Sequence, residues 1–313
     1  MTAPMLATLT DRYFSDPDWV FERKLDGERV IGTRSGRTAT LRSRTGRILD
    51  GTYPELVRAL RRQRGNFVVD GEVVAFAGNR TSFERLQQRI GLTDPVRAEA
   101  SGVPVHFYLF DLLSLAGEDL TGLPLRERKR RLRAAIGFGG PLRYTAHRNT
   151  EGEELFAEAC RRGWEGVIAK RADAPYRSGR SSDWLKFKCV GEQEFVIGGF
   201  TDPTGSRHGF GALLVGVYDG GELRFAGKVG TGFDHQTLTR LRSRMDALAT
   251  ASSPFHGAVR ERGAHWVRPE LVAQIGFTEW TRDGRLRHPR FLGLRRDKAA
   301  RAVVRERPTG ATR

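Results

Sequence analysis

The sequence predicts an α+β protein of two domains, residues 1–190 and 191–313. Helix and strand patterns are mixed over the first 190 residues, whereas short strands separated by Gly-rich turns follow Gly191. At 313 residues the chain is long enough for two domains of ordinary size. We therefore expect a larger mixed domain followed by a smaller one rich in β-strands.

In the first domain, hydrophobic alternation predicts strands and helical periodicity predicts helices. The strands are expected at residues 19–25, 29–34, 38–42, 67–76, 105–115 and 166–171, and the helices at 53–64, 125–136 and 153–162. Asp26-Gly27 marks a turn after the first strand, and Asp70-Gly71 predicts an apolar hairpin. The nearly continuous apolar run 105–115 is typical of a strand buried on both faces.

In the second domain, short hydrophobic runs predict strands at residues 195–200, 212–218, 223–229, 271–281 and 286–288, with one helix at 235–248. Five or so short strands and one helix in roughly 120 residues suit a small Greek-key barrel such as an OB fold.

Basic residues dominate the charge of the chain, because 53 Lys and Arg against 37 Asp and Glu give a net charge of +16 and a pI near 10.7. This balance is too basic for an ordinary metabolic enzyme and indicates a polyanionic partner. No stretch approaches the roughly 20 apolar residues that a membrane-spanning helix needs, and the first residues lack the pattern of a signal peptide. We therefore expect no membrane association.

Cysteine and lysine are both scarce. Cys160 and Cys189 are expected to make no disulfide framework and no zinc site, which indicates a reducing compartment. Only 7 of the 53 basic residues are lysine. Because an amine, unlike a guanidinium, can lose its proton near neutral pH and act as a nucleophile, the few lysines are candidates for catalysis.

One of them, Lys24, begins a Lys-x-Asp-Gly motif at the end of a predicted strand. Alone, this motif is more typical of a charged hairpin than of an active site. Other motifs follow it in order: Ser-Arg-Thr-Gly at 43–46, Asp-Gly-Glu at 70–72, Tyr-Leu-Phe-Asp at 108–111, Glu-Gly-Val-Ile-Ala-Lys at 165–170, Trp-Leu-Lys-Phe-Lys at 184–188 and Arg-Arg-Asp-Lys at 295–298.

This ordered set resembles the covalent nucleotidyltransferase superfamily of polynucleotide ligases and mRNA capping enzymes. It is most similar to ATP-dependent DNA ligases, and among them to the ligase domain of bacterial ligase D. The resemblance covers essentially the whole chain, including residues 197–200 and 227–232 of the second domain. It implies an ATP-grasp-like nucleotidyltransferase domain of antiparallel sheets with flanking helices, followed by an OB-fold β-barrel domain.

The resemblance implies that Lys24 attacks the α-phosphate of ATP, which gives lysyl-AMP and releases pyrophosphate. The AMP then passes to the 5′-phosphate of a DNA nick and leaves when the 3′-hydroxyl attacks. The amine must be neutral to react, and we expect Lys186, Lys188 and a bound metal to lower its pKa. Because they are two residues apart on a strand, Lys186 and Lys188 point the same way and are expected to reach the α-phosphate together.

The resemblance also implies roles in nucleotide and phosphate binding. Glu22 would lie near the adenine amino group, Phe110 would stack on adenine, and Glu72 would contact the ribose. Arg29 and Arg44 suit the 5′-phosphate of the nick, because a guanidinium grips a phosphate with two hydrogen bonds.

Carboxylates and the remaining lysines complete the expected site. Asp26, also a candidate catalytic residue, and Glu165 are expected to hold Mg²⁺ or Mn²⁺, since hard carboxylate oxygens suit these cations. Lys170 is expected to face the nucleotide. Lys228, in a Gly-rich turn, is expected to contact the DNA backbone, whereas Lys129 is predicted to lie on a solvated helix face.

Arg295, Asp297 and Lys298 resemble the motif of the second domain that moves over ATP and orients the pyrophosphate, which implies domain closure and reopening. Nicked or broken duplex DNA is the expected partner, with a Ku-type end-binding protein as a possible helper. We expect a monomeric, stand-alone ligase of DNA repair or end joining, in the bacterial cytoplasm and associated with the nucleoid.

Two alternatives stay open at this point. An RNA ligase or a GTP-using capping enzyme shares the Lys-x-Asp-Gly and Arg-x-Asp-Lys motifs, and labelling by GTP or sealing confined to RNA would favour it. A DNA-binding scaffold with an inactive site would share the basic charge, and only covalent labelling by ATP separates it from a ligase.

Overall fold

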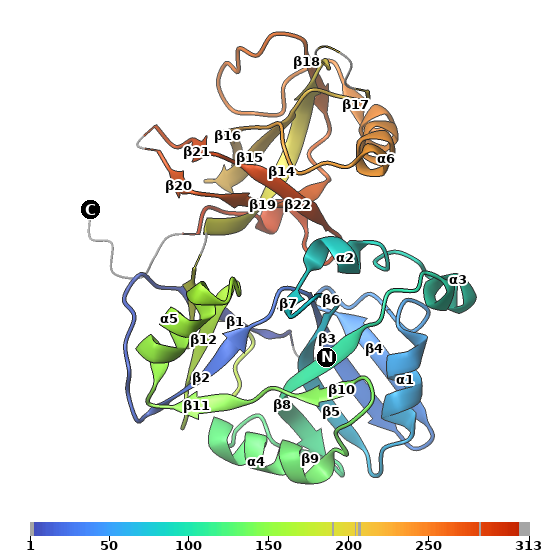
Figure 1. Ribbon diagram of the computed structural model, residues 1–313, viewed down its shortest axis with the longest axis vertical. Coiled ribbons are helices and arrows are strands. Elements are labelled where there is room, and N and C mark those ends of the chain that lie inside the picture. The colour runs from blue at the N-terminus through green and yellow to red at the C-terminus, as the bar shows by residue number, and fades with distance from the viewer. Residues whose placement is uncertain (1–2, 190, 204, 206–207, 282, 307–313) are drawn as a thin grey trace. The chain divides into compact units, whose positions relative to one another are not determined.

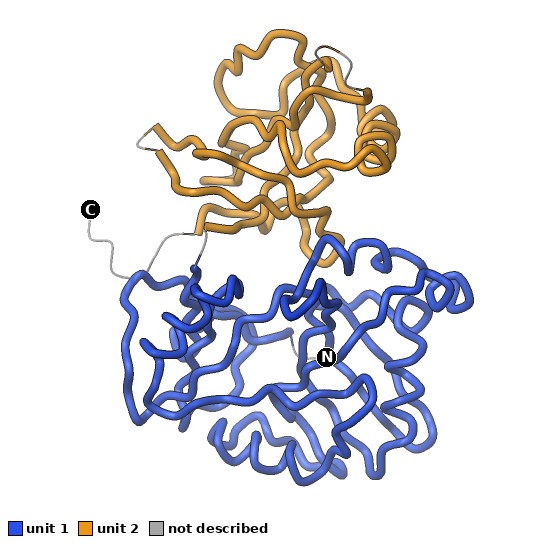
Figure 2. The backbone as a smooth tube through the Cα atoms, viewed as in Figure 1, with its two compact units in different colours: residues 1–189, 307–313 blue, residues 190–306 orange. Residues whose placement is uncertain are grey.

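The computed structural model describes residues 3–189, 191–203, 205, 208–281 and 283–306 (Figure 1). The chain divides into two compact units, residues 1–189 with 307–313 and residues 190–306 (Figure 2). We call them unit 1 and unit 2 and describe each by itself. Among the described residues, no helix has both the length and the apolar character needed to span a membrane.

Unit 1 contains a five-stranded sheet in the order β1-β13-β12-β2-β11. Its strands are β1 (Met5–Leu9), β2 (Trp19–Lys24), β11 (His147–Asn149), β12 (Gly166–Arg171) and β13 (Gly179–Lys188). Helix α5 (Gly152–Arg161) packs on the face where Phe21, Val167 and Phe187 are fully buried. Because side chains alternate along a strand, the charged neighbours of these residues, such as Glu22, point to the other face.

A six-stranded sheet completes the main framework of unit 1, in the order β10-β8-β5-β3-β4 with β9 paired to β8. Its strands are β3 (Glu28–Ser35), β4 (Thr38–Ser43), β5 (Phe67–Val74), β8 (His106–Leu115), β9 (Glu118–Asp119) and β10 (Leu142–Tyr144). Helices α1 (Pro54–Arg61) and α4 (Leu125–Ala135) pack on this sheet, and Leu56, Leu60 and Leu132 join its core.

The predicted hairpin at Asp70-Gly71 is wrong, because β5 runs through both residues as one strand. Gly71 is needed there for close packing rather than for a turn. A Cβ on this residue would lie 2.5 Å from the carbonyl oxygen of Tyr108 on the neighbouring strand β8. An Asp-Gly pair therefore marks a turn at Asp26-Gly27, between β2 and β3, but a tight strand contact at Asp70-Gly71.

Four short elements follow β5 in the chain, and two of them contact the Asp26-Gly27 turn. They are β6 (Phe76–Ala77), β7 (Arg80–Thr81), α2 (Phe83–Gln87) and α3 (Pro95–Ala100). The backbone N–H of Asp26 donates to Thr81 Oγ1 at 3.3 Å, and the N–H of Phe83 donates to the Asp26 carboxylate at 3.2 Å. These bonds fix the turn that follows Lys24.

Unit 2 is built from short antiparallel strands around one core. Its main sheet contains β14 (Gly191–Thr201), β15 (Leu213–Asp219), β16 (Glu222–Val229), β17 (Ala249–Thr250), β18 (Ala264–Val267), β19 (Val272–Phe277) and β22 (Arg290–Arg295). The strands β20 (Glu279–Trp280) and β21 (Leu286–Arg287) form a separate pair, helix α6 (His235–Asp246) packs on the core, and a 3₁₀ turn covers Ala300–Ala302. Within the described ranges, the strand pairings do not close into a ring.

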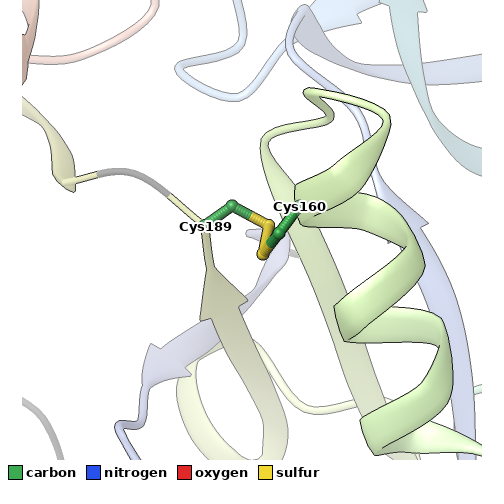
Figure 3. Close-up of a disulfide and its surroundings, with 2 residues drawn as sticks. All are labelled: Cys160 and Cys189. Atoms are coloured by element: carbon green, nitrogen blue, oxygen red, sulfur yellow. A yellow bond between two sulfur atoms is a disulfide. The ribbon is translucent and has the colours of Figure 1, made fainter.

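The two cysteines form a disulfide, which corrects the expectation that they would not pair. Cys160 lies on α5 and Cys189 directly follows β13, with their Cα atoms 5.2 Å apart (Figure 3). The packing of α5 on this sheet brings together two residues that are 29 positions apart in the sequence. The expectation of a reducing compartment therefore loses the observation on which it rested.

Candidate active site

Strand β2 places Lys24 on a face shared with two other lysines. In the ladder of β2, β12 and β13, Gly166 lies opposite both Lys24 and Lys188, and Ile168 lies opposite both Glu22 and Lys186. Residues opposite each other in neighbouring strands project to the same side of the sheet. Lys24, Lys186 and Lys188 therefore share one face, turned away from the buried aromatic side chains under α5.

Gly166, between Lys24 and Lys188 in the ladder, allows the neighbouring backbone to approach closely. Its φ of +150° is a conformation that favours glycine, and a Cβ there would lie 1.8 Å from the carbonyl oxygen of Phe187. The Glu-Gly pair at 165–166 thus combines a close strand contact with a carboxylate that reaches Lys24.

The amine of Lys24 forms an ion pair with Glu165, whose side chain is only 7% exposed. Burial alone would lower the pKa of Lys24, but attraction by Glu165, Asp26 and Glu72 outweighs it and raises the pKa above its ordinary value. The expectation that the neighbouring lysines lower this pKa is therefore wrong for the structure as it stands. Carboxylates rather than ammonium groups dominate the surroundings of Lys24.

Asp26 and Glu165 fit a divalent cation. A carboxylate oxygen of Asp26 and one of Glu165 lie within 4.8 Å of each other. Oε2 of Glu165 is buried and has no hydrogen-bond partner, although Oε1 contacts Lys24. A buried carboxylate oxygen without a partner is costly unless a cation or water satisfies it. Both residues are hard oxygen donors of the kind that Mg²⁺ prefers.

Glu22, two residues before Lys24, lies in a fully buried cluster with two lysines. Its carboxylate contacts Lys129 at 2.5 Å and Lys170 at 2.6 Å, and all three side chains are 2% exposed. Burial alone would raise the pKa of Glu22, but the two lysines outweigh it and lower the pKa. The prediction of a solvated Lys129 is wrong, because this side chain turns inward from α4 and also donates to the carbonyl oxygen of Thr145 at 3.2 Å.

Phe110 stands at a bulge of β8 and contacts two cations. The register of β5 and β8 shifts between Asp70 and Gly71, so that Phe110 has no direct partner on β5. The Lys170 amine lies 4.1 Å from the centre of its ring, and the Arg29 guanidinium carbon lies 4.4 Å away. Trp184 of β13 meets the same ring edge to face at 6.0 Å. Phe110 is buried here and forms part of the contact between the two sheets.

Arg29 is held by a buried carboxylate that the motif analysis did not assign to the site. Its Nε and Nη2 donate to the two oxygens of Asp70 at 2.5 and 2.7 Å, and Tyr176 donates its hydroxyl to the same carboxylate at 2.5 Å. Burial would lower the pKa of Arg29, but Asp70 outweighs it and raises this pKa. The edge of Arg29 that was expected to grip a phosphate is therefore engaged within the protein.

Glu72 and Arg44 come from the six-stranded sheet and its margin. Glu72 lies opposite Arg29 in the ladder of β3 and β5, and its charge contributes to the raised pKa values of Lys24 and Arg29. Arg44 directly follows β4 and is partly buried. Their expected contacts with ribose and phosphate stay predictions.

The predicted residues of unit 2 pair within that unit. Arg295, at the end of β22, donates through Nε and Nη2 to both oxygens of Asp297 at 2.9 Å. Lys298 donates to Glu194 at 2.8 Å. Lys228 is 59% exposed and forms an ion pair with Glu261 at 3.0 Å, so its expected contact with DNA also stays a prediction.

The fold is that of a nucleotidyltransferase domain joined to a second, β-rich domain, and comparison with known families shows which family this is. The family described as ATP dependent DNA ligase domain matches residues 4–188, and the family described as ATP dependent DNA ligase C terminal region matches residues 206–298. The chain belongs to the ATP-dependent DNA ligase family. This confirms the predicted fold class, a nucleotidyltransferase domain followed by an OB-fold domain.

Curated relatives include longer end-joining proteins. The chain is 40% identical to the Multifunctional non-homologous end joining protein LigD of Pseudomonas aeruginosa and 38% identical to that of Mycolicibacterium smegmatis, over 98% and 97% of its own length. It spans 37% and 40% of the length of these relatives. A DNA ligase of Thermococcus fumicolans is 32% identical over 89% of the chain.

A solved structure of similar length agrees with this assignment. It is that of mycobacterial DNA ligase D complexed with ATP and MES, which matches with a TM-score of 0.70 and 36% identity. The match covers 97% of this chain and 98% of that one. The likeness to the ligase domain of bacterial ligase D, expected from the motifs, is thereby confirmed.

Proposed function

We propose that this chain is an ATP-dependent DNA ligase that joins a 5′-phosphate to a 3′-hydroxyl through lysyl-AMP on Lys24 and a DNA-adenylate. The observation that carries the proposal is the row of Lys24, Gly166 and Lys188 across three strands, with Glu165 on the Lys24 amine, in a chain of this family. This arrangement places one partly exposed amine among the charges that a phosphate-transfer reaction needs.

In the first step, the lone pair of Lys24 Nζ attacks the α-phosphorus of ATP. A phosphorus–nitrogen bond forms, the bond from the α-phosphorus to the bridging oxygen breaks, and pyrophosphate leaves. The resting ammonium of Lys24 first loses one proton to give the neutral amine that attacks, and the nitrogen loses a second proton as the phosphoramidate forms. Lys186 and Lys188 share its face of the sheet and would neutralise the negative charge on the α-phosphate.

In the second step, an oxygen of the DNA 5′-phosphate attacks the phosphorus of lysyl-AMP and the phosphorus–nitrogen bond breaks. The departing nitrogen takes up one proton to leave as the neutral amine and a second to return to the ammonium form. In the third, the 3′-hydroxyl attacks the 5′-phosphate, loses its proton and displaces AMP. The phosphodiester bond is then complete.

Asp26 and Glu165 would hold Mg²⁺ or Mn²⁺. A bound divalent cation would supply positive charge that competes with Lys24 for these carboxylates and so lowers the pKa of the amine. Glu165 therefore has two roles in the proposal. It keeps Lys24 in place before the nucleotide binds, and it provides oxygen ligands afterwards.

We assign the nucleotide pocket to the space bordered by both sheets of unit 1. Phe110 would stack on adenine, with Glu22 near the amino group and Glu72 near the ribose. Lys170, whose amine lies 4.1 Å from the centre of the Phe110 ring, would face the nucleotide. We keep the 5′-phosphate of the nick as the ligand of Arg44 and of the remaining nitrogen of Arg29, since Asp70 engages the other two.

Unit 2 and the biological setting belong to the same proposal. Arg295, Asp297 and Lys298 would orient the pyrophosphate when the two units close on ATP.

We propose a monomeric enzyme of DNA end joining that acts on nicked or broken duplex DNA, alongside a Ku-type end-binding protein, in the cytoplasm at the nucleoid. The likeness to multifunctional end-joining proteins supports this setting.

The test is covalent labelling followed by sealing. The purified chain is incubated with α-labelled ATP and Mg²⁺. One portion is denatured to detect covalently bound label, and a second portion is kept native and given a nicked duplex. We expect label on Lys24, loss of label in Lys24→Arg, and a sealed strand with the unaltered chain. A wild-type chain that takes no label would refute the proposal, and intact-mass measurement would detect an AMP adduct independently.

The same experiment tests the alternatives. An RNA ligase would seal a nick only in RNA, and a capping-type enzyme would take label from GTP. The comparisons do not favour either, since the matching families and relatives are DNA ligases.

A further inference from the structure

Two arginines pack on the indole of Trp164, in the turn between α5 and β12, and a third lies against the residue before it. The guanidinium carbon of Arg23 lies 4.3 Å from the centre of the Trp164 rings, and that of Arg162 lies 5.3 Å from it. Two guanidinium groups therefore pack on one indole. Such contacts orient a cation without neutralising its charge.

Arg80, on β7, joins them from another part of unit 1. The turn residue Gly163 has a φ of +65°, and a Cβ there would lie 2.8 Å from Nη1 of Arg80. The Arg80 side chain therefore rests on the turn that carries Trp164, in the place that another residue's side chain would occupy. We call Arg23, Arg80 and Arg162 the arginine rim.

The positive charge of the rim is largely unbalanced. Over the residues that the structure describes, Arg162 alone of the three forms an ion pair, with Glu158 at 2.8 Å. Nε and Nη2 of Arg23 are buried without a hydrogen-bond partner. These two nitrogens form the edge that grips an oxyanion with two parallel bonds, as the same edge of Arg29 does with Asp70.

The surroundings of Arg23 support the same conclusion. Burial lowers the pKa of its guanidinium, Tyr108 raises it, and Arg162 lowers it again, and no carboxylate is among these causes. A buried donor pair without an acceptor carries a desolvation cost, which an anion from outside the protein would relieve.

Arg23 of the rim lies next to Lys24 in the sequence but on the opposite face of the sheet. Arg23 directly precedes Lys24, and Trp164 directly precedes Glu165. Because neighbouring residues of a strand point to opposite faces, the Arg23 side chain does not share the face on which Lys24 meets ATP. An anion on the rim would therefore be a separate one from the α-phosphate.

We propose that the arginine rim binds a backbone phosphate of the duplex beside the nick. This rests on the proposed ligase function and adds to it a DNA contact outside the residues that the motifs identified. Trp164 keeps the guanidinium planes in place, and the free edge of Arg23 together with Arg80 receives the phosphate oxygens.

The experiment compares Arg23→Gln/Arg80→Gln with Arg61→Gln/Arg64→Gln. The second variant removes the same charge from exposed residues that have no ion pair in the described part of the chain. Each protein is first adenylated, and affinity for a nicked duplex ending in a 3′-dideoxy nucleotide, which cannot be sealed, is measured from 50 to 200 mM salt. We expect the rim variant to bind about 10-fold more weakly at about 0.1 M salt. Its slope of log K against log [salt] should be smaller by about 1 to 2.

Several outcomes separate the possibilities. Equal weakening of the rim variant and its control would mean that only net charge matters, and would overturn the proposal. A higher KM for ATP in self-adenylation with unchanged DNA affinity would assign the anion to ATP and overturn it too. Arg23→Lys/Arg80→Lys keeps both positive charges and so controls for a folding defect in the Gln variant. It should restore most of the salt slope. If no protein takes label from ATP, the ligase function itself fails.

Discussion

Two groups of lysine and carboxylate lie side by side on β2 and differ in composition and exposure. Around Glu22, one carboxylate is shared by Lys129 and Lys170, and all three side chains are 2% exposed. Around Lys24, one amine that is 18% exposed is attracted by Glu165, Asp26 and Glu72. The first group has an excess of ammonium groups and the second an excess of carboxylates.

This difference separates support from chemistry. Glu22 is ionised and fixed by two lysines, so that its group holds α4, β2 and β12 together. The excess of carboxylates around Lys24 keeps the amine protonated until positive charge arrives from outside. The nucleophile is thus restrained by the same side chains that are suited to a cation. Glu22 and Lys24 are only two residues apart on β2, yet the first belongs to a structural ion pair and the second to a reactive one.

The largest effect is expected from Lys24→Arg. The guanidinium keeps the positive charge and a bond to Glu165 but cannot supply a neutral amine. We expect self-adenylation to fall by at least about 1000-fold, with the midpoint of chemical denaturation unchanged. A variant that still takes label would show that the reactive group lies elsewhere.

Glu22→Gln is expected to lower stability, because it removes the carboxylate that contacts both buried lysines. Leaving buried charges without a partner costs about 3–5 kcal/mol. Urea denaturation followed by far-UV circular dichroism would measure this loss. Glu127→Gln, at a surface carboxylate paired with Arg130 and Arg131, should leave the midpoint unchanged. If both variants unfold at the same urea concentration, the Glu22 group is not structural.

Removing Glu165, one of the carboxylates around Lys24, should raise the Mg²⁺ concentration that adenylation needs. Glu165→Gln loses one charged oxygen donor, and we expect the Mg²⁺ concentration that gives half-maximal adenylation to rise by about 10- to 100-fold. The exposed α5 variant Glu154→Gln is the matched control. Titration of EDTA-treated protein gives both midpoints, and an unchanged midpoint in Glu165→Gln would exclude Glu165 as a ligand.

Local sequence patterns predicted part of the group around Lys24. Alternation along β13 predicts that Lys186 and Lys188 share a face, and the ladder through β12 puts Lys24 on the same face. The Lys24–Glu165 pair joins two motifs that were found separately. Short-range patterns were sufficient there, because each residue stands at the end of a hydrophobic strand.

Long-range contacts could not be predicted in the same way. Lys129 lies in a run of charged residues that is typical of a solvated helix, and its burial follows from Glu22, which is 107 positions away. The direction of the Lys24 pKa shift depends on Glu165, Asp26 and Glu72, which three different segments supply. Nothing near Cys160 or Cys189 indicated their pairing, which depends on the packing of α5.

The smallest effect concerns His147, which lies opposite Glu22 on β11. Burial first, and then Lys129, lower its pKa to about 4, despite attraction by Glu22. Below an ordinary pKa near 6.5, the unfolded chain takes up a proton that the folded chain refuses. The free energy of unfolding should therefore decrease as the pH falls from about 6.5 to about 4, by at most about 1.4 kcal/mol per pH unit. In His147→Gln this part of the slope should disappear, while the two proteins differ by a constant amount above pH 7. Parallel stability curves from pH 4 to 8 would show that the lysines around Glu22 do not repel a proton from His147.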